Sequence, residues 1–157
     1  MNSLEFYKET LKLLIKHKVE FLVVGGYAVN SYGFMRSTGD MDLWVVNDES
    51  NLNKLSNALK TLKYSLDAIQ TGIEELRQNR NISLKHGKFF KVELISFLSS
   101  TLAFKEAYGR KEVKIILGMD VGVVGYDDLC FLKIKSGRNK DLLDVKELKQ
   151  IRKENSQ

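Results

Sequence analysis

The sequence predicts an α/β protein, of the α+β kind, with a small mixed β-sheet flanked by helices and closed by a C-terminal helical segment. Short apolar runs, which are typical of buried strands, alternate with longer segments whose apolar residues recur at helical spacing. The 157 residues include no proline, so glycine, asparagine and aspartate must form the turns. The length suits one domain with a single core.

The first part of the chain predicts two strands and three helices. A helix with regularly spaced leucines covers residues 3–17, and a buried strand at 21–24 ends at a Gly-Gly pair. A short helix follows at 27–32, and a second strand at 41–46. Leucines at helical spacing mark another helix through residues 52–62.

The second part predicts further strands joined by glycine turns and two final helices. We expect a short helix at 73–80, a hairpin of strands 82–85 and 89–95, a helix near 100–108, strands at 113–117 and 121–124, a helix ending near 135, and a last helix at 139–152. Asp127 or Asp128 is the expected N-cap of the penultimate helix.

Composition places the chain among ordinary globular proteins, with 43% hydrophobic and 29% charged residues. No apolar run approaches the roughly 20 residues that span a bilayer. The N-terminal segment is amphipathic rather than a signal peptide. The single cysteine, Cys130, excludes an internal disulfide and is expected to be buried. We therefore expect a cytoplasmic protein without a membrane partner.

Asp40 and Asp42 form an Asp-x-Asp pair at the start of the second strand. Alternate residues of a strand share a face, so both carboxylates project together while Met41, Leu43 and Val45 point into the core. Two neighbouring carboxylates repel unless a cation lies between them. Oxygen ligands of this kind suit Mg²⁺ in the presence of phosphate oxygens. The pair therefore predicts a magnesium site.

Gly25 and Gly26 lie at a strand-to-helix junction, where the absence of side chains lets backbone N–H groups approach phosphate oxygens. The alternative is a tight turn without chemistry. Arg36 and Thr38 come just before the two aspartates. They either contact a triphosphate or belong to the surface of the loop.

Glu93 is the best candidate for a third acid. Val92 and Leu94 define one face of its strand, which leaves Glu93 on the other face with Lys91. An acid between apolar residues in mid-strand indicates a partner. The alternative is a solvent-facing glutamate on an edge strand.

Val24-Gly25-Gly26, followed after thirteen residues by Asp40-Met41-Asp42-Leu43, resembles the defining pattern of the DNA polymerase β-like nucleotidyltransferase superfamily. Residues 25–30, 36–45 and 127–145 more narrowly resemble the small bacterial DUF6036 group, which is related to AbiEii-type toxins. The resemblance covers nearly the whole chain and is loose between residues 50 and 88. It implies a single nucleotidyltransferase domain at 1–157, with a core at about 1–125 and C-terminal helices at about 126–153.

The resemblance implies a role for each acid. The metal-binding acids of the superfamily correspond to Asp40 and Asp42, and its third acid corresponds to Glu93. Relatives often have aspartate at that third position. Together the three acids would hold one or two Mg²⁺ ions, and Glu93 would complete the second metal site or accept a proton from the acceptor.

The C-terminal tail carries the basic residues that the resemblance assigns to the nucleotide. Eight basic and three acidic residues lie between Lys133 and Lys153. By resemblance, Lys133 contacts the nucleotide phosphates and Lys140, with Asp141, matches a basic–Asp pair in which relatives often have arginine. Asp144 either orients Lys140 or Lys133 or lies on a surface face. From charge alone, the tail either meets a polyphosphate or nucleic acid or is a solvated helix face.

These inferences predict a Mg²⁺-dependent enzyme that moves a nucleoside monophosphate from an NTP to an acceptor. By resemblance, the acceptor is RNA, such as a tRNA 3′ end, or a protein, and the enzyme is the toxin of a toxin–antitoxin pair with an antitoxin partner. One alternative is an aminoglycoside or lincosamide nucleotidyltransferase, which shares the glycine and aspartate pattern but lacks an obvious match to the tail. The other is a non-catalytic nucleotide-binding or partner-binding module.

Overall fold

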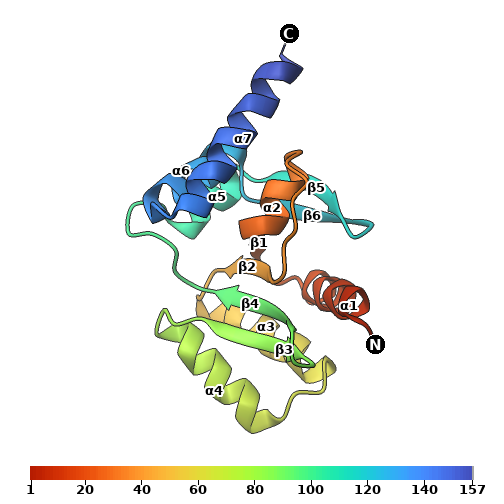
Figure 1. The fold of residues 1–157 in the computed structure, drawn as a ribbon. Coiled ribbons are helices and arrows are strands. Elements are labelled where there is room, and N and C mark those ends of the chain that lie inside the picture. Colours follow the sequence, from red (N-terminus) through yellow and green to blue (C-terminus); the bar gives the residue numbers. More distant parts are fainter. Residues whose placement is uncertain (157) are drawn as a thin grey trace.

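A six-stranded mixed sheet with the strand order β3-β4-β2-β1-β6-β5 forms the centre of the computed structural model, which describes residues 1–156 (Figure 1). The strands are β1 (Phe21–Val24), β2 (Met41–Val45), β3 (Ile82–His86), β4 (Phe90–Ile95), β5 (Glu112–Ile116) and β6 (Met119–Val123). Three antiparallel pairs, β1 with β2, β3 with β4, and β5 with β6, are joined by parallel contacts of β2 with β4 and β1 with β6. The predicted mixed sheet is confirmed.

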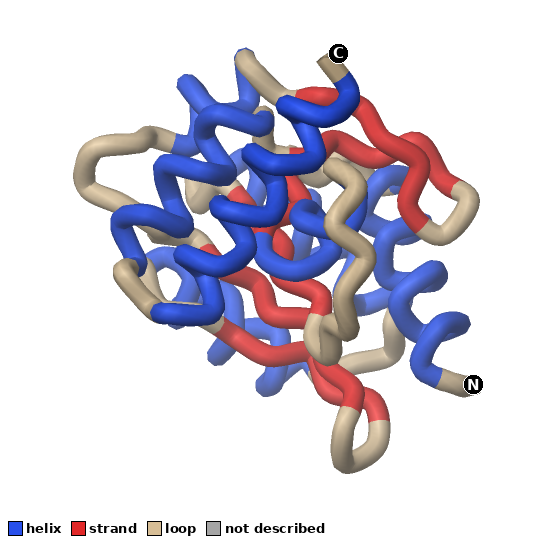
Figure 2. Tube along the Cα trace, turned by 45° about the horizontal axis from the view of Figure 1, so that its top comes forward, coloured by secondary structure: helices blue, strands red, loops and turns tan. Residues whose placement is uncertain are grey.

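Helices lie on both sides of the strands (Figure 2). They are α1 (Ser3–Lys16), α2 (Gly25–Ser31), α3 (Glu49–Thr61), α4 (Leu66–Arg77), α5 (Phe104–Gly109), α6 (Tyr126–Ser136) and α7 (Asn139–Asn155). Helices α6 and α7 pack against each other, and α2 contacts α6, β1 and β2. Within residues 1–156, no helix has the length and apolar character needed to cross a membrane.

Helix α4 is longer than the sequence predicts and begins earlier. The expected range was 73–80, whereas the helix begins at Leu66 because the Ser65 hydroxyl caps it by accepting a hydrogen bond from the N–H of Ala68. Its buried face consists of Ile69, Ile73 and Leu76. The helix ends at Arg77, and Asn79 has a left-handed φ of 63°.

The N-cap of α6 is Gly125 rather than Asp127 or Asp128. A Cβ at Gly125 would lie 2.7 Å from the carbonyl oxygen of Arg110, so the chain needs glycine there. Asp128, in the first turn, instead forms a bidentate ion pair with the Arg110 guanidinium at 2.9 and 3.1 Å.

Alternation along β2 positions the site. Met41, Leu43 and Val45 are fully buried on one face, as predicted, and Asp42 projects from the other. Cys130 is also buried, as expected, and burial raises the pKa of its thiol. Asp42 therefore extends from a sheet whose opposite face is sealed by the core.

Candidate active site

Four neighbouring strands place one residue each in a single row across the sheet. Val24 of β1 is opposite Asp42 of β2, Asp42 is opposite Glu93 of β4, and Glu93 is opposite Ser83 of β3. Residues that are opposite each other on adjacent strands project to the same face. The Ser83 hydroxyl donates a hydrogen bond to Glu93. Two of the acids that the sequence singles out are therefore neighbours on adjacent parallel strands.

Asp40 lies just before β2, and a lysine connects it to Glu93. The ammonium of Lys91 is 3.0 Å from Oε1 of Glu93 and 3.6 Å from Oδ2 of Asp40. Over residues 1–156, no three His, Cys, Asp or Glu side chains are gathered as a ready set of metal ligands. In this arrangement Lys91 supplies positive charge beside two of the three acids.

The electrostatics of Asp42 show that the acids suit a cation. Burial, together with the negative charges of Glu93 and Asp40, raises the pKa of Asp42 from 3.8 to about 6, against the opposing effects of Lys133 and Lys91. An ionised Asp42 is therefore costly in the metal-free protein. Carboxylate oxygens around such a position are the ligand type that Mg²⁺ prefers, so the residues fit this ion.

Both glycines of the Gly-Gly pair lie where a side chain would collide with the site. Gly25 has a φ of 65°, and a Cβ there would be 2.4 Å from Oδ2 of Asp42. At Gly26, a Cβ would be 2.1 Å from Oγ1 of Thr38. Helix α2 begins at Gly25 itself, two residues before the predicted start. The pair therefore lets the first turn of α2 lie directly against Asp42 and the segment that precedes it.

A buried group of charges joins that segment to the C-terminal helices. The Arg36 guanidinium binds both carboxylate oxygens of Asp144, at 2.7 and 2.9 Å. The Lys133 ammonium lies 2.9 Å from Asp144 and 3.0 Å from Asp141. Burial tends to raise the pKa of Asp144, but Arg36 and Lys133 outweigh this effect and hold that pKa below its usual range. Asp144 therefore contacts Lys133, one of the two lysines that it was expected to orient, and it also binds Arg36, which was not expected.

Lys140 is not one of the basic residues that Asp141 and Asp144 bind. It is exposed and forms no ion pair with any residue of the described chain, although it lines the cleft. Asp141 is bound instead by Lys133 and by Arg138, whose Nε is 2.9 Å from Oδ2 of Asp141. Adjacent residues of a helix do not face each other, whereas residues three apart do. Arg138 is thus a site residue that sequence reasoning missed, and its spacing from Asp141 was the available signal.

Two adjoining compartments with volumes of about 280 and 400 Å³ form a cleft beside these residues. Residues shared by both are Gly25, Asp42, Lys133, Arg138 and Asp141. The larger compartment is polar and is also lined by Gly26, Arg36, Thr38, Gly39, Asp40 and Lys140. The smaller compartment is mixed: one part of its lining is apolar and consists of Val24, Ile95, Leu98, Leu129 and Leu132.

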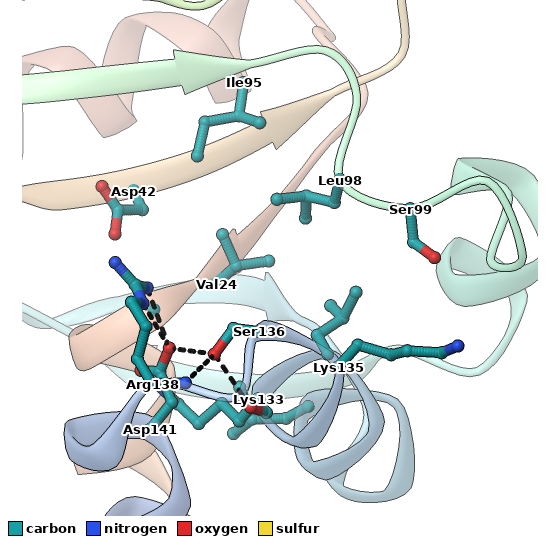
Figure 3. A pocket seen from close by; sticks show the side chains of 13 residues that line it. Val24, Asp42, Ile95, Leu98, Ser99, Lys133, Lys135, Ser136, Arg138 and Asp141 are labelled. Atoms are coloured by element: carbon teal, nitrogen blue, oxygen red, sulfur yellow. Dashed lines mark hydrogen bonds and ion pairs between the residues drawn. The ribbon is translucent and has the colours of Figure 1, made fainter.

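Figure 3 shows the smaller compartment, with Asp42 on the sheet side and Arg138, Lys133, Ser136 and Asp141 on the helix side. The apolar lining is a part of the site that the sequence analysis did not identify. Glu93 lines neither compartment and lies one strand away from Asp42. The structure therefore brings the proposed nucleotide-binding residues together and places Glu93 beside them.

Three solved structures with a similar fold come from proteins that modify antibiotics or confer resistance to them. The lincomycin-bound lincosamide adenylyltransferase LnuA has a TM-score of 0.60 and 16% identity over 96% of this chain and 98% of its own. A solution structure of the antibiotic-resistance factor ANT(2″)-Ia gives 0.59 and 11%, covering 92% and 81% of the two chains. Its complex with adenylyl-2″-tobramycin gives 0.54 and 12%, covering 92% and 86%. At these identities, the likeness shows the fold.

Family membership comes from the sequence. No curated protein matches the chain. The model of the family DUF2204, described as nucleotidyl transferase of unknown function, matches residues 3–157. The narrower resemblance to the DUF6036 group and the AbiEii-type toxins stays a prediction. Because the match spans almost the whole sequence, the chain belongs to the DUF2204 family of nucleotidyl transferases.

Proposed function

We propose that this nucleotidyltransferase depends on Mg²⁺ and transfers a nucleoside monophosphate from an NTP to a hydroxyl or phosphate of an acceptor. The observation that carries the proposal is the position of Asp42. It lies where a polar compartment lined by glycines and basic side chains meets a second compartment that has an apolar part. A nucleoside triphosphate has the same division between a charged chain and a largely apolar base.

In this proposal the polar compartment receives the triphosphate. Gly25 and Gly26 allow the phosphates to approach the backbone, as their close contacts with Asp42 and Thr38 indicate. Arg36 and Lys133 add positive charge to the lining of this compartment, although both also form ion pairs with Asp144. Exposed Arg138 and Lys140, with Thr38 beside them, complete the polar lining.

Asp40, Asp42 and Glu93 would hold the metal. Bound Mg²⁺ would offset negative charge on the phosphates. Glu93 accepts the proton of the acceptor hydroxyl while the acceptor oxygen bonds to the α-phosphorus. The bond from that phosphorus to the bridging oxygen breaks, and pyrophosphate leaves. For Glu93 to act in this way, Lys91 must give up its contact with the carboxylate.

The decisive experiment incubates the protein and Mg²⁺ with each α-³²P-labelled NTP and a cell lysate that contains RNA and protein. Label in a macromolecule, lost in Asp42→Asn and in EDTA, is the expected result. Calorimetry of Mg²⁺–NTP binding separates an enzyme from a non-catalytic module. Binding without transfer supports the NTP site and leaves the acceptor to be found, whereas absence of binding favours a non-catalytic module.

The antibiotic alternative has specific support, since the neighbours named above act on, or are bound to, lincomycin and tobramycin. It is tested by incubating the protein with Mg²⁺, ATP and either drug and measuring the drug mass by mass spectrometry. A mass increase of one AMP would establish this function. In the leading proposal the acceptor is RNA or protein, and the enzyme is a toxin that an antitoxin neutralises. Under that proposal we expect neither drug to be modified.

A further inference from the structure

The turn between β3 and β4 forms a basic and aromatic surface beside the acids. Lys85, Gly87, Lys88, Phe89, Phe90 and Lys91 line a pocket of about 380 Å³. We call this set of residues the hairpin tip. Phe89 is 81% exposed and Phe90 is 43% exposed. Two large aromatic side chains held in water at one turn contribute little to the core, which indicates a role in contact with another molecule.

The hairpin tip is uniformly basic. Residues 84–91 contain three lysines and no acid. Within the described chain, Lys85 and Lys88 take part in no ion pair, whereas Lys91 pairs with Asp40 and Glu93. A partner that covers this surface must therefore carry negative charge. A polycationic drug would be repelled by it.

The register of β3 and β4 places lysines of the hairpin tip on the same face of the sheet as Glu93. Lys85 is opposite Lys91, and the next pair of residues on the same face is Ser83 and Glu93. Phe89, in the turn, comes two residues before Lys91 and four before Glu93, so its Cα lies at most about 13 Å from that of Glu93. A flexible ligand bound along this face would thus run from the exposed aromatic ring, past the lysines, to Glu93.

Next to the turn, the hairpin is anchored on its other face. His86, opposite Phe90, stacks on Phe6 of α1 with ring centroids 5.1 Å apart. One ring nitrogen of His86 lies 2.5 Å from the carbonyl oxygen of Met1. The lysine-bearing face is therefore presented by a hairpin that is held from its opposite face, next to the turn.

We infer that the hairpin tip binds the single-stranded end of an RNA acceptor, with an unpaired base stacked on Phe89 and backbone phosphates bound by Lys85, Lys88 and Lys91. This inference rests on the proposed function, in which RNA is an acceptor. Aromatic rings combined with basic residues are the usual means of holding single strands, because each unpaired base offers a face for stacking. Bases stacked within a duplex offer no such face to a narrow turn.

Fluorescence anisotropy with a labelled single-stranded 12-nucleotide RNA, without NTP or metal, tests binding at this surface. Phe89→Leu should weaken binding at least about fivefold, and Phe89→Tyr, which keeps an aromatic ring, should not. Lys85→Ala/Lys88→Ala should reduce the slope of log affinity against log salt by about 1.4, or about 0.7 for each lost phosphate contact. Lys12→Ala/Lys60→Ala, which removes two exposed lysines from α1 and α3, is the matched control.

The inference would be overturned by no RNA binding by the wild type, equal binding by Phe89→Leu, equal weakening by the control pair, or tighter binding of a blunt duplex. Labelling of protein instead of RNA in the lysate would do so too. Calorimetric binding of Mg²⁺–NTP is expected to be unchanged in all of these variants. Loss of NTP binding in the wild type would instead count against the proposed function, which makes the two failures distinguishable.

Discussion

Arg36 and Asp144 form a bidentate ion pair that ties the segment before β2 to α7, with nitrogen–oxygen distances of 2.7 and 2.9 Å. Lys133 of α6 binds the same carboxylate, and the Asp144 side chain is 1% exposed. One buried aspartate therefore holds two of the basic groups proposed to face the triphosphate. Asp144 is a positioning residue in this arrangement.

Asp144→Ala should lower the free energy of unfolding by roughly 3–5 kcal/mol, because it leaves buried basic groups without their partner. It should also raise the KM for NTP, since Arg36 and Lys133 lose their common support. Urea denaturation measures the first effect and steady-state kinetics the second. Arg36→Lys keeps the positive charge but loses the bidentate ion pair, so we expect an intermediate loss of stability. A cost below about 1 kcal/mol for Asp144→Ala would contradict this view.

Asp42→Asn should reduce kcat at least roughly 100-fold, because a metal ligand that contributes several kcal/mol is removed. The variant should remain folded, since asparagine has nearly the same shape. Label transfer from α-³²P-NTP gives the rate, and circular dichroism gives the fold. Activity close to that of the wild type would exclude Asp42 from the metal site.

The raised pKa of Asp42 predicts how the stability of the metal-free protein depends on pH. The pKa of Asp42 is about 6 in the folded protein against 3.8 ordinarily, so the folded state binds the proton more tightly. Stability is therefore lost as pH rises from about 4 through 6, and Asp42→Asn should escape this loss. Melting temperatures in EDTA at pH 4.5 and 7.5 test this expectation. Asp42→Asn should exceed the wild type by more at pH 7.5, and an equal difference at both pH values would refute it.

Gly26→Ala should disturb the loop before β2, because its Cβ would lie 2.1 Å from Oγ1 and 2.8 Å from Cβ of Thr38. Such overpacking typically costs about 1–3 kcal/mol. Weaker NTP binding should accompany the loss of stability. The double variant Gly26→Ala/Thr38→Gly removes both colliding atoms and should recover part of each loss, as measured by calorimetry and thermal melting. No recovery would mean that Gly26 is needed for a reason other than space.

Lys91→Met should tighten Mg²⁺ binding, because the ammonium beside Asp40 and Glu93 competes with a cation for the same carboxylates. The metal-free variant should also melt at a lower temperature, since the acids lose their neutralising partner. Isothermal titration with Mg²⁺ provides the affinity. Lys12→Met is the control, because Lys12 is exposed on α1. Weaker Mg²⁺ binding by Lys91→Met alone would show that Lys91 supports the site instead.

The sequence was most informative where a short pattern fixes both the element and its chemistry. The segment from Phe21 to Val46 predicted a strand, a helix and a second strand in that order, and burial of Met41 and Leu43 confirmed which face of β2 is polar. Glu93 was identified because an acid lies between two apolar residues in the middle of a strand. Both inferences rely on the alternation of a strand, which is a local property.

Contacts between distant segments were much less accessible. The pairing of Arg36 with Asp144 spans 108 residues, and no periodicity connects them. The contact of Lys91 with Asp40 depends on the register between β2 and β4. Helix α4 was predicted too short because its start is marked by a single capping serine, Ser65, in place of a change in periodicity. These features are properties of the assembled sheet and helices.

The row from Val24 to Ser83 has a consequence for how the protein folds. Asp42 and Glu93 belong to parallel strands, and α3, α4 and β3 lie between them in the chain. A shift of one residue in this pairing would turn Glu93 to the opposite face, into the core. Non-local pairs of this kind form slowly, because a long loop must close first. Recovery of activity during refolding should therefore lag behind recovery of helix content, which makes activity a direct reporter of correct strand alignment.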